Sequence, residues 1–256
     1  MRDNQRSPLP RWRLALFLLS AVAIFGALYV LYAGLNTLRR LDLVEAERDT
    51  WQRPSDVLEA LDLHPGNVVV DLGSGAGYFA LKLSPAVGVQ GEVLAIDLRK
   101  LSLSFLWIRA ALRAPHNIHV IVGDEDDPHL PANSVDAILI ANTYHEFRNP
   151  AVMLRASFRA LRPGGRLVIV DRGPGARPAE YPSHEIARSA VERELRQAGF
   201  AILRHEDPFI DRSGDDPWWL VAARRAPVAL KQLDVVPERV VVQKARRRLG
   251  RRGGRG

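Results

Sequence analysis

"VVVDLGSGAGYFALKLS", residues 68–84, combines in one short stretch the patterns of a strand, a glycine-rich turn and a helix. Its apolar start is typical of a buried strand ending near Asp71, and its end has the spacing of a helix. Between them stand Gly73, Gly75 and Gly77, in a turn where backbone amides can approach a ligand and a helix N-terminus adds partial positive charge. The stretch therefore predicts a nucleotide-binding loop, with a purely structural strand-to-helix turn as the alternative.

Apolar runs around this stretch recur at the spacing of a βαβ series. They are residues 67–72, 92–97, 118–123, 134–141 and 165–171, followed by two further strand candidates at 200–205 and 218–225. Helix-compatible sequence lies between them, with Ser55 and Asn149 where helix N-caps are expected. Strands that are apolar throughout and alternate with helices predict a mostly parallel α/β sheet with helices on both faces.

Three acidic residues indicate which ligand the loop holds. Asp71 directly precedes the glycines, where it would repel a pyrophosphate and attract an ammonium group, and the absence of a following Lys-Ser/Thr pair excludes a triphosphate P-loop. Asp97 ends the next strand, 24 residues after Gly73, where a carboxylate accepts hydrogen bonds from ribose hydroxyls. Asp124 either accepts from an adenine amino group or belongs to a solvated acidic loop.

Four ordered motifs resemble the class I S-adenosylmethionine-dependent methyltransferases. They are "VVVDLGSGAGYF", "VLAID", "VGDEDDPHLPANSVDAILIANTYHEF" and "LRPGGRLVIVD", and the resemblance covers residues 51 to about 225. It implies a Rossmann-like seven-stranded sheet whose last strand is antiparallel, with S-adenosyl-L-methionine as cofactor. The cofactor-binding residues that the resemblance implies are Asp71, Gly73, Ser74, Gly75 and Gly77 for the methionine portion, Asp97 and Leu98 for the ribose, Asp124 and Glu125 for the adenine, and Asn142 near the sulfonium.

Methyl transfer from a sulfonium is a direct displacement, so an acid or base is needed only when the acceptor must lose a proton. The segment "NTYHEF" places Tyr144, His145 and Glu146 beside the expected pocket as candidate catalytic residues. His145 is the candidate general base, because an unperturbed histidine has a pKa near 6.5. The alternative is that His145 and Glu146 cap the following helix or orient the loop. A metal site built from His145, Glu146 and His129 lacks any recognised spacing, so no metal is expected.

Residues 14–35 are 22 consecutive positions without a charge, enough for a helix to cross the roughly 30 Å hydrocarbon core of a membrane. A cleaved signal peptide is the alternative, but its apolar region would be about 7–15 residues long. Four arginines precede the segment and four follow it closely, so the positive-inside rule is nearly tied. Because S-adenosylmethionine is a cytoplasmic metabolite, we expect a single-pass membrane protein with its catalytic domain in the cytoplasm.

The expected organisation has five parts. A basic segment (1–13), a transmembrane helix (14–35) and a helical linker (36–52) precede the methyltransferase domain (53–226), and a basic tail (227–256) follows it. The net charge of +7 equals that of residues 244–256, a Gly/Arg tract expected to be disordered. This tail either keeps the chain soluble or attracts anionic lipid. Nucleic acid is not an expected partner, because the domain has no basic stripe interleaved with aromatic residues.

The methyl acceptor is the component of the reaction that the sequence specifies least. Only residues 172–183 separate the fifth strand candidate from the next helix, so no substrate-binding subdomain is built there. We expect a small acceptor that is hydrophobic, lipid-like or associated with the membrane. The chain has no cysteine, which excludes disulfides and thiol nucleophiles. Two alternatives stay open: an NAD-dependent Rossmann oxidoreductase, and a membrane-tethered methyltransferase-fold scaffold without activity.

Overall fold

A computed structural model describes residues 11–226 of the chain, except 115, 176–184 and 213–215. The predicted basic tail and the first ten residues lie outside the described residues. The described part forms one seven-stranded sheet in the order β3-β2-β1-β4-β5-β7-β6. Its strands are β1 (Val68–Leu72), β2 (Glu92–Asp97), β3 (Ile118–Val122), β4 (Val135–Ala141), β5 (Leu161–Arg172), β6 (Phe200–Asp211) and β7 (Pro217–Arg225).

The strand directions bring the predicted ligand-binding residues to one edge. Strands β1 to β5 pair in parallel, whereas β7 is antiparallel to both β5 and β6. Strand β1 lies between β2 and β4, so the order of the sheet reverses beside it. The carboxyl ends of these three strands carry Asp71, Asp97 and Asn142. The predicted fold is confirmed, and ligands bind at such a switch point in sheets of this kind.

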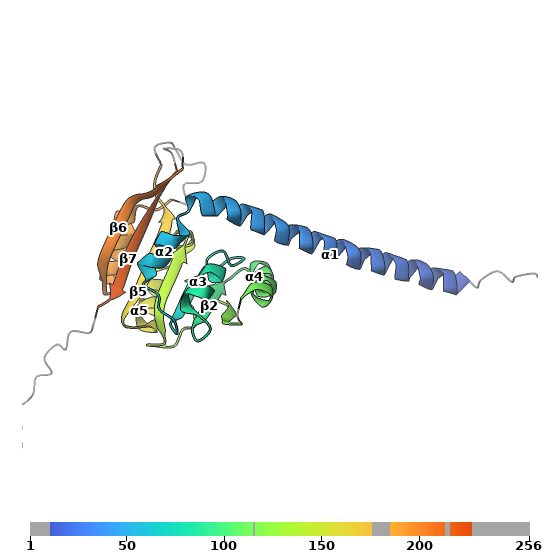
Figure 1. Ribbon diagram of the computed structural model, residues 1–256, viewed down its shortest axis with the longest axis horizontal. Coiled ribbons are helices and arrows are strands. Elements are labelled where there is room, and N and C mark those ends of the chain that lie inside the picture. The colour runs from blue at the N-terminus through green and yellow to red at the C-terminus, as the bar shows by residue number, and fades with distance from the viewer. Residues whose placement is uncertain (1–10, 115, 176–184, 213–215, 227–256) are drawn as a thin grey trace, which may run out of the picture.

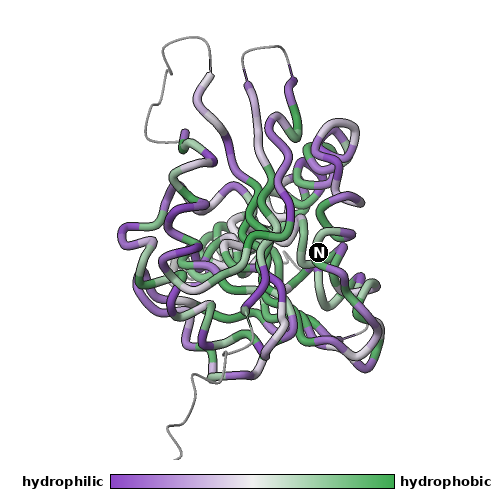
Figure 2. The backbone as a smooth tube through the Cα atoms, turned by 90° about the vertical axis from the view of Figure 1, so that its left-hand side faces the viewer, coloured by the Kyte–Doolittle hydropathy of each residue, from purple (hydrophilic) through white to green (hydrophobic). Residues whose placement is uncertain are grey.

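Hydrophobic side chains cover both faces of the sheet. One buried cluster packs α2 (Pro54–Leu61), α3 (Ala80–Val87) and α4 (Lys100–Arg113) against one face. The other packs α5 (Pro150–Ala160) and α6 (Arg188–Gln197) against the opposite face. Figure 2 shows the hydrophobic segments gathered at the centre of the domain and the hydrophilic ones around its periphery. Successive strand residues point to opposite faces, which explains why both clusters draw on the same apolar strands.

Helix α1 (Arg11–Trp51) is one continuous helix of 41 residues. The predicted transmembrane segment 14–35 and linker 36–52 are therefore parts of a single element, which projects from the domain in Figure 1. It is the one helix in the described residues that is long and apolar enough to cross a membrane. Its C-terminal end packs on the domain, where Tyr78 donates a hydrogen bond of 2.8 Å to Asp49.

Two local predictions needed correction. Helix α2 begins at Pro54, with Arg53 and not Ser55 in the N-cap position. Proline is favoured in the first helical turn because its fixed φ and missing N–H fit there. Asn149 does occupy the N-cap of α5, as predicted, but its side chain makes no capping hydrogen bond. Strand β6 continues to Asp211, well beyond the predicted end at residue 205.

Candidate active site

The glycine loop is held against strand β2 by its own backbone. The amides of Gly73 and Ser74 donate to the carbonyl oxygen of Ile96 at 2.8 and 3.0 Å, and the amide of Gly75 donates to Asp97 Oδ2 at 2.8 Å. Gly73 has φ +86°, and a Cβ atom there would overlap the side chain of Thr143. A Cβ atom on Gly75 would meet nothing within 4 Å, so the loop leaves open space in front of this residue.

We expect Gly73→Ala to damage the site more than its backbone conformation alone explains. Gly164 has nearly the same φ, +84°, but open space around its Cβ position, so Gly164→Ala is a matched control. The control should lose about 1–2 kcal/mol of stability from the left-handed conformation alone. Gly73→Ala should lose more and should also weaken ligand binding, because Thr143 must move. Thermal unfolding and calorimetric titration of both variants check this, and equal losses would contradict the steric explanation.

Asp71 is buried, with only 2% of its surface exposed. Burial raises the pKa of this carboxyl from 3.8 to about 7, and nearby Asp97 adds to the effect, while a backbone hydrogen bond from Ala80 and the charge of Arg48 oppose it. Within the described part of the chain, its Oδ2 atom has no hydrogen-bond partner. An unpartnered buried carboxylate oxygen is costly unless a ligand satisfies it, which makes Asp71 a candidate binding residue for a cation.

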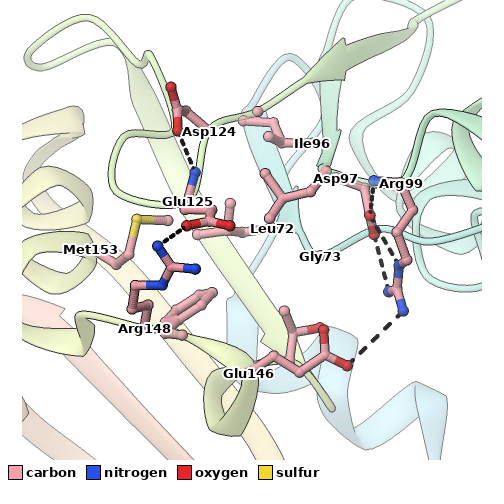
Figure 3. A pocket seen from close by; sticks show the side chains of 14 residues that line it. Leu72, Gly73, Ile96, Asp97, Arg99, Asp124, Glu125, Glu146, Arg148 and Met153 are labelled. Carbon is pink, nitrogen blue, oxygen red and sulfur yellow. Dashed lines mark hydrogen bonds and ion pairs between the residues drawn. The ribbon is translucent and has the colours of Figure 1, made fainter.

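Two cavities meet at the glycine loop. The first, of about 200 Å³, is lined by Leu72, Gly73, Ile96, Asp97, Leu98, Arg99, Gly123, Asp124, Glu125, Thr143, Glu146, Phe147, Arg148 and Met153 (Figure 3). The second, of about 280 Å³, is lined by Leu41, Val44, Glu45, Arg48, Asp71, Gly73, Ser74, Gly75, Ala76, Tyr78, Phe79, Arg99, Ser102, Ala141, Asn142 and Thr143. They share Gly73, Arg99 and Thr143, so one extended ligand can occupy both.

Asp97 lines the first cavity, and its acceptor positions are filled. Its Oδ1 accepts from the backbone amide and Nε of Arg99 at 2.8 and 3.2 Å, and its Oδ2 accepts from Arg99 Nη2 and the Gly75 amide at 3.3 and 2.8 Å (Figure 3). Burial raises the pKa of Asp97, but these hydrogen bonds outweigh it and hold the pKa below its usual value. A ligand hydroxyl can reach this carboxylate only when the side chain of Arg99 moves aside.

Both acidic residues of the predicted adenine site line the first cavity. The amide of Glu125 donates to Asp124 Oδ1 at 2.6 Å, and the Glu125 carboxylate pairs with Arg148 at 2.7 Å. Asp124 is also exposed, so it belongs to a solvated acidic loop and lines the cavity at the same time; the two interpretations of this residue do not exclude each other. Asn142 lines the second cavity. Its backbone N–H donates a hydrogen bond of 2.7 Å to the carbonyl oxygen of Val170 on β5.

Two of the three candidate catalytic side chains do not line these cavities. Tyr144 is fully buried and donates to Glu194, and burial together with this carboxylate raises the pKa of its hydroxyl. His145 Nδ1 lies 2.8 Å from Asp171 Oδ1, and the backbone amide of His145 donates to the same carboxylate. Both side chains turn to partners inside the protein, so neither contributes to the walls of these two cavities, and their catalytic role stays a prediction. Glu146 does line the first cavity, with its Oε1 4.0 Å from Arg99 Nη1.

No metal site is visible in the part of the chain that the structure describes. His129 is exposed and lies 3.7 Å from Asp127. Glu45 and Arg48 of α1 and Ser102 of α4 also line the second cavity, and none of the three is a predicted site residue. Glu45 and Arg48 are three residues apart and so share one helix face, a signal that the sequence carries. The sequence does not show, however, that this helix face lies over the glycine loop, because that contact forms only in the folded domain.

Comparisons with known proteins agree with this geometry. A family model described as "Methyltransferase domain" matches residues 63–206. Similar curated proteins include phosphoethanolamine N-methyltransferase 1 of Arabidopsis thaliana, 28% identical over 72% of this chain and 35% of that protein. A ubiquinone/menaquinone biosynthesis C-methyltransferase, UbiE, of Vibrio cholerae serotype O1 is 30% identical over 47% of this chain and 46% of that protein. The chain thus spans less than half the length of these two relatives.

Among solved structures, a SAM dependent methyltransferase from Aquifex aeolicus is 26% identical. The match covers 74% of this chain and 98% of that one, with a TM-score of 0.63. These matches favour a methyl donor over NAD as the ligand of the glycine loop. The chain belongs to the class I S-adenosylmethionine-dependent methyltransferases, and S-adenosylmethionine is its cofactor.

Proposed function

We propose that the protein is a membrane-anchored methyltransferase whose acceptor is a small, hydrophobic or membrane-associated molecule. One observation carries the proposal: the second cavity is walled by Leu41, Val44 and Glu45 of α1, the same uninterrupted helix that contains the apolar segment 14–35. A molecule that reaches this cavity along α1 comes from the side where the apolar segment lies. The part of α1 that follows the apolar segment thus walls one side of this cavity.

The cavities fit the cofactor. The unpartnered Oδ2 of Asp71 suits the ammonium of its methionine portion, and Asp97 in the first cavity suits the ribose hydroxyls. The first cavity, with Ile96 and Leu98 beside Asp124, suits the adenine. When bound, the cofactor supplies a methyl group activated by a positively charged sulfur. The two cavities measure about 200 and 280 Å³, and together they reach the roughly 300–1,000 Å³ usual for ligand pockets.

Arg99 should compete with the ribose for Asp97. Because the side chain of Arg99 is 57% exposed, its ion pair is worth at most about 1 kcal/mol. We therefore expect Arg99→Ala to bind S-adenosylmethionine up to about fivefold more tightly, measured by calorimetric titration. Arg148→Ala is the control, since Arg148 lines the same cavity but pairs with Glu125. Weaker binding by Arg99→Ala alone would mean that Arg99 holds the ligand instead of competing with it.

The chemistry required of the protein is alignment. Methyl transfer needs donor and acceptor at near-attack distance with water excluded, which can contribute about 7–11 kcal/mol. In the second cavity the ionisable groups closest to the role of a base are engaged: Glu45 pairs with Arg109, and the Tyr78 hydroxyl donates to Asp49. The site therefore favours acceptors whose nucleophilic atom can attack without first losing a proton to the protein, such as a neutral amine or an already ionised oxygen.

The exposed surface of α1 supports anchoring. Its large apolar side chains between Leu16 and Leu35 are exposed all around the helix, as expected for contact with lipid. A cleavage after the apolar segment would cut a helix that continues into the cavity wall, which favours an uncleaved anchor over a signal peptide. The cofactor is made in the cytoplasm, so we place the domain there. Anionic lipid as a partner of the basic tail concerns residues outside the described ones.

The name of one relative fits this acceptor class. It is named for ubiquinone and menaquinone biosynthesis. Quinones are hydrophobic rings, which would present their nucleophile at a membrane surface, where α1 would hold the second cavity. The other relative is named for phosphoethanolamine, which is small but soluble in water, so it represents the acceptor class that the test below must exclude.

The test is transfer of a labelled methyl group from S-adenosylmethionine in membranes that contain the full-length protein. We expect label in the lipid extract, and mass spectrometry of cells without the protein should show a lipid that lacks one methyl group. Label in water-soluble metabolites alone would overturn the proposed acceptor class. Binding of the cofactor with no transfer to any fraction would favour the inactive scaffold. Protease protection in sealed vesicles tests the cytoplasmic placement of the domain.

A further inference from the structure

Helix α4 carries an apolar face that the protein does not cover, and we propose that this face docks on the membrane from which α1 emerges. The inference rests on the proposed membrane anchoring of α1. It assigns a second lipid contact to the catalytic domain, separate from the anchor. The occupant of the face is the lipid headgroup layer of the same membrane.

Helix α4 carries apolar side chains on two of its sides. Its inner side packs Leu103 and Leu106 into the core, as any surface helix does. Its outer side exposes Leu101, Ile108 and Leu112, which recur at helical spacing. Trp107 is also exposed, and Trp107 and Leu112 keep 65% and 74% of their surface in contact with solvent. A helix that is apolar on both sides normally has a partner on each of them.

Ion pairs hold α4 beside the part of α1 that follows the apolar segment. Arg113 pairs with Asp42 at 2.7 Å, and Arg109 pairs with Glu45. Asp42 is seven residues beyond Leu35, which corresponds to about 10 Å along a helix. The headgroup layer on each side of a membrane is about 5–8 Å thick. The end of α4 that carries Leu112 and Arg113 therefore lies close to the outer boundary of that layer.

The orientation and the charges are consistent with lipid. Figure 1 shows α4 at the edge of the domain that faces along the projecting part of α1. Arg39 and Arg40 are exposed on α1 between the apolar segment and Asp42, where cations meet anionic headgroups. Trp107 has the amphipathic side chain that is enriched at membrane interfaces. A lipid surface matches both the apolar face and the arginines beside it.

Docking would direct the active site toward the membrane. Helix α4 contributes Ser102 to the second cavity, and α1 contributes Leu41 and Val44 to it. The cavity thus lies between the two helices that would contact lipid. An acceptor could pass from the membrane into the cavity without crossing bulk water, which is the advantage that a second contact adds to a simple tether.

The chain has no cysteine, so single cysteines can carry a nitroxide label in the full-length protein. We propose Leu112→Cys as the test position, with Trp107→Cys as a second test position. Leu203→Cys is the control, because Leu203 is exposed on β6 on the other side of the domain. Leu28→Cys, on the exposed surface of α1, reports whether the anchor is inserted. The protein is placed in nanodiscs of phosphatidylcholine and phosphatidylglycerol, and collisions of the label with oxygen and with a water-soluble nickel complex are compared.

We expect the oxygen-to-nickel collision ratio at position 112 to exceed that at 203 by roughly threefold or more, because oxygen concentrates in lipid. If the collision ratios at positions 112 and 107 match that at 203, while the ratio at position 28 shows that it lies in lipid, the docking of α4 is overturned and the membrane anchor is retained. If the ratio at position 28 shows that it lies in water, the anchoring proposal fails and the inference fails with it. Disulfide bridges between two copies of the unlabelled Leu112→Cys variant would also overturn the inference, since a second copy would then cover the face.

Discussion

Asp71→Asn should make the ligand-free protein more stable at pH 8 while it weakens binding of S-adenosylmethionine. The folded pKa of Asp71, about 7, is raised above the usual 3.8, so the carboxyl favours folding fully below about pH 4 and this contribution is lost as pH rises through 7. Asparagine does not ionise. The variant should therefore gain up to about 4 kcal/mol over the wild type at pH 8 and little at pH 4.

Binding should change in the opposite direction. An amide cannot replace the charge that holds an ammonium group, a loss of about 2–3 kcal/mol, or roughly 30- to 150-fold in affinity at pH 8. In the wild type, affinity should fall by up to about tenfold per pH unit below 7, as Asp71 takes up a proton. Chemical unfolding and calorimetric titration across this pH range measure both effects.

Asp126→Asn is the matched control, since Asp126 is exposed and lines neither cavity. It should change neither stability nor affinity by more than about 0.5 kcal/mol. Wild-type affinity in Asp71→Asn at pH 8 would show that Asp71 does not hold the cofactor. A stability difference from the wild type that is independent of pH would show that its carboxyl does not titrate in the folded protein.

Arg109→Ala should destabilise the attachment of α1 to the domain by about 3–5 kcal/mol. The side chain of Arg109 is only 1% exposed, and its Nη1 donates to Glu45 at 2.7 Å and to the carbonyl of Ala76 at 2.6 Å. The substitution leaves the carboxylate of Glu45 without its cation and removes a support of the glycine loop. We expect a lower unfolding temperature, cleavage by protease between α1 and α2, and weaker cofactor binding.

Arg113→Ala is the control on the same helix. Arg113 makes an equally direct pair with Asp42, but both side chains are about half exposed. The loss should stay below about 1 kcal/mol, because water screens the pair and solvates the partner that remains. If the two variants lose the same stability, the buried pair with Glu45 does not hold α1 in place.

Local sequence predicted most of the fold. The strands at residues 67–72, 92–97 and 118–123 were placed to within a residue, because buried parallel strands are apolar throughout and have clear ends. The glycine loop followed from the same stretch. The positions of Asp71 and Asp97 could also be predicted, since parallel strands that start together bring their carboxyl ends to one edge.

Side-chain direction in "NTYHEF" could not be predicted. Tyr144 turns to Glu194 and His145 to Asp171, which are 50 and 26 residues further along the chain. Both carboxylates reach this loop only because β5 and α6 pack beside it. Arg99 is only two residues from Asp97, but sequence proximity does not set the rotamer of a long side chain, so its position on the acceptor atoms of Asp97 is known only from the structure.

The strand series, the glycine loop with its acidic residues and the apolar length of segment 14–35 could all be predicted, since each depends on residues that are neighbours in the chain. The position of α1 in the wall of the second cavity is known only from the packed fold. It depends on Glu45 and Arg109, 64 residues apart, meeting in a buried ion pair that attaches α1 to the domain. Contacts over such distances arise when the sheet and its helices pack, and no local pattern encodes them.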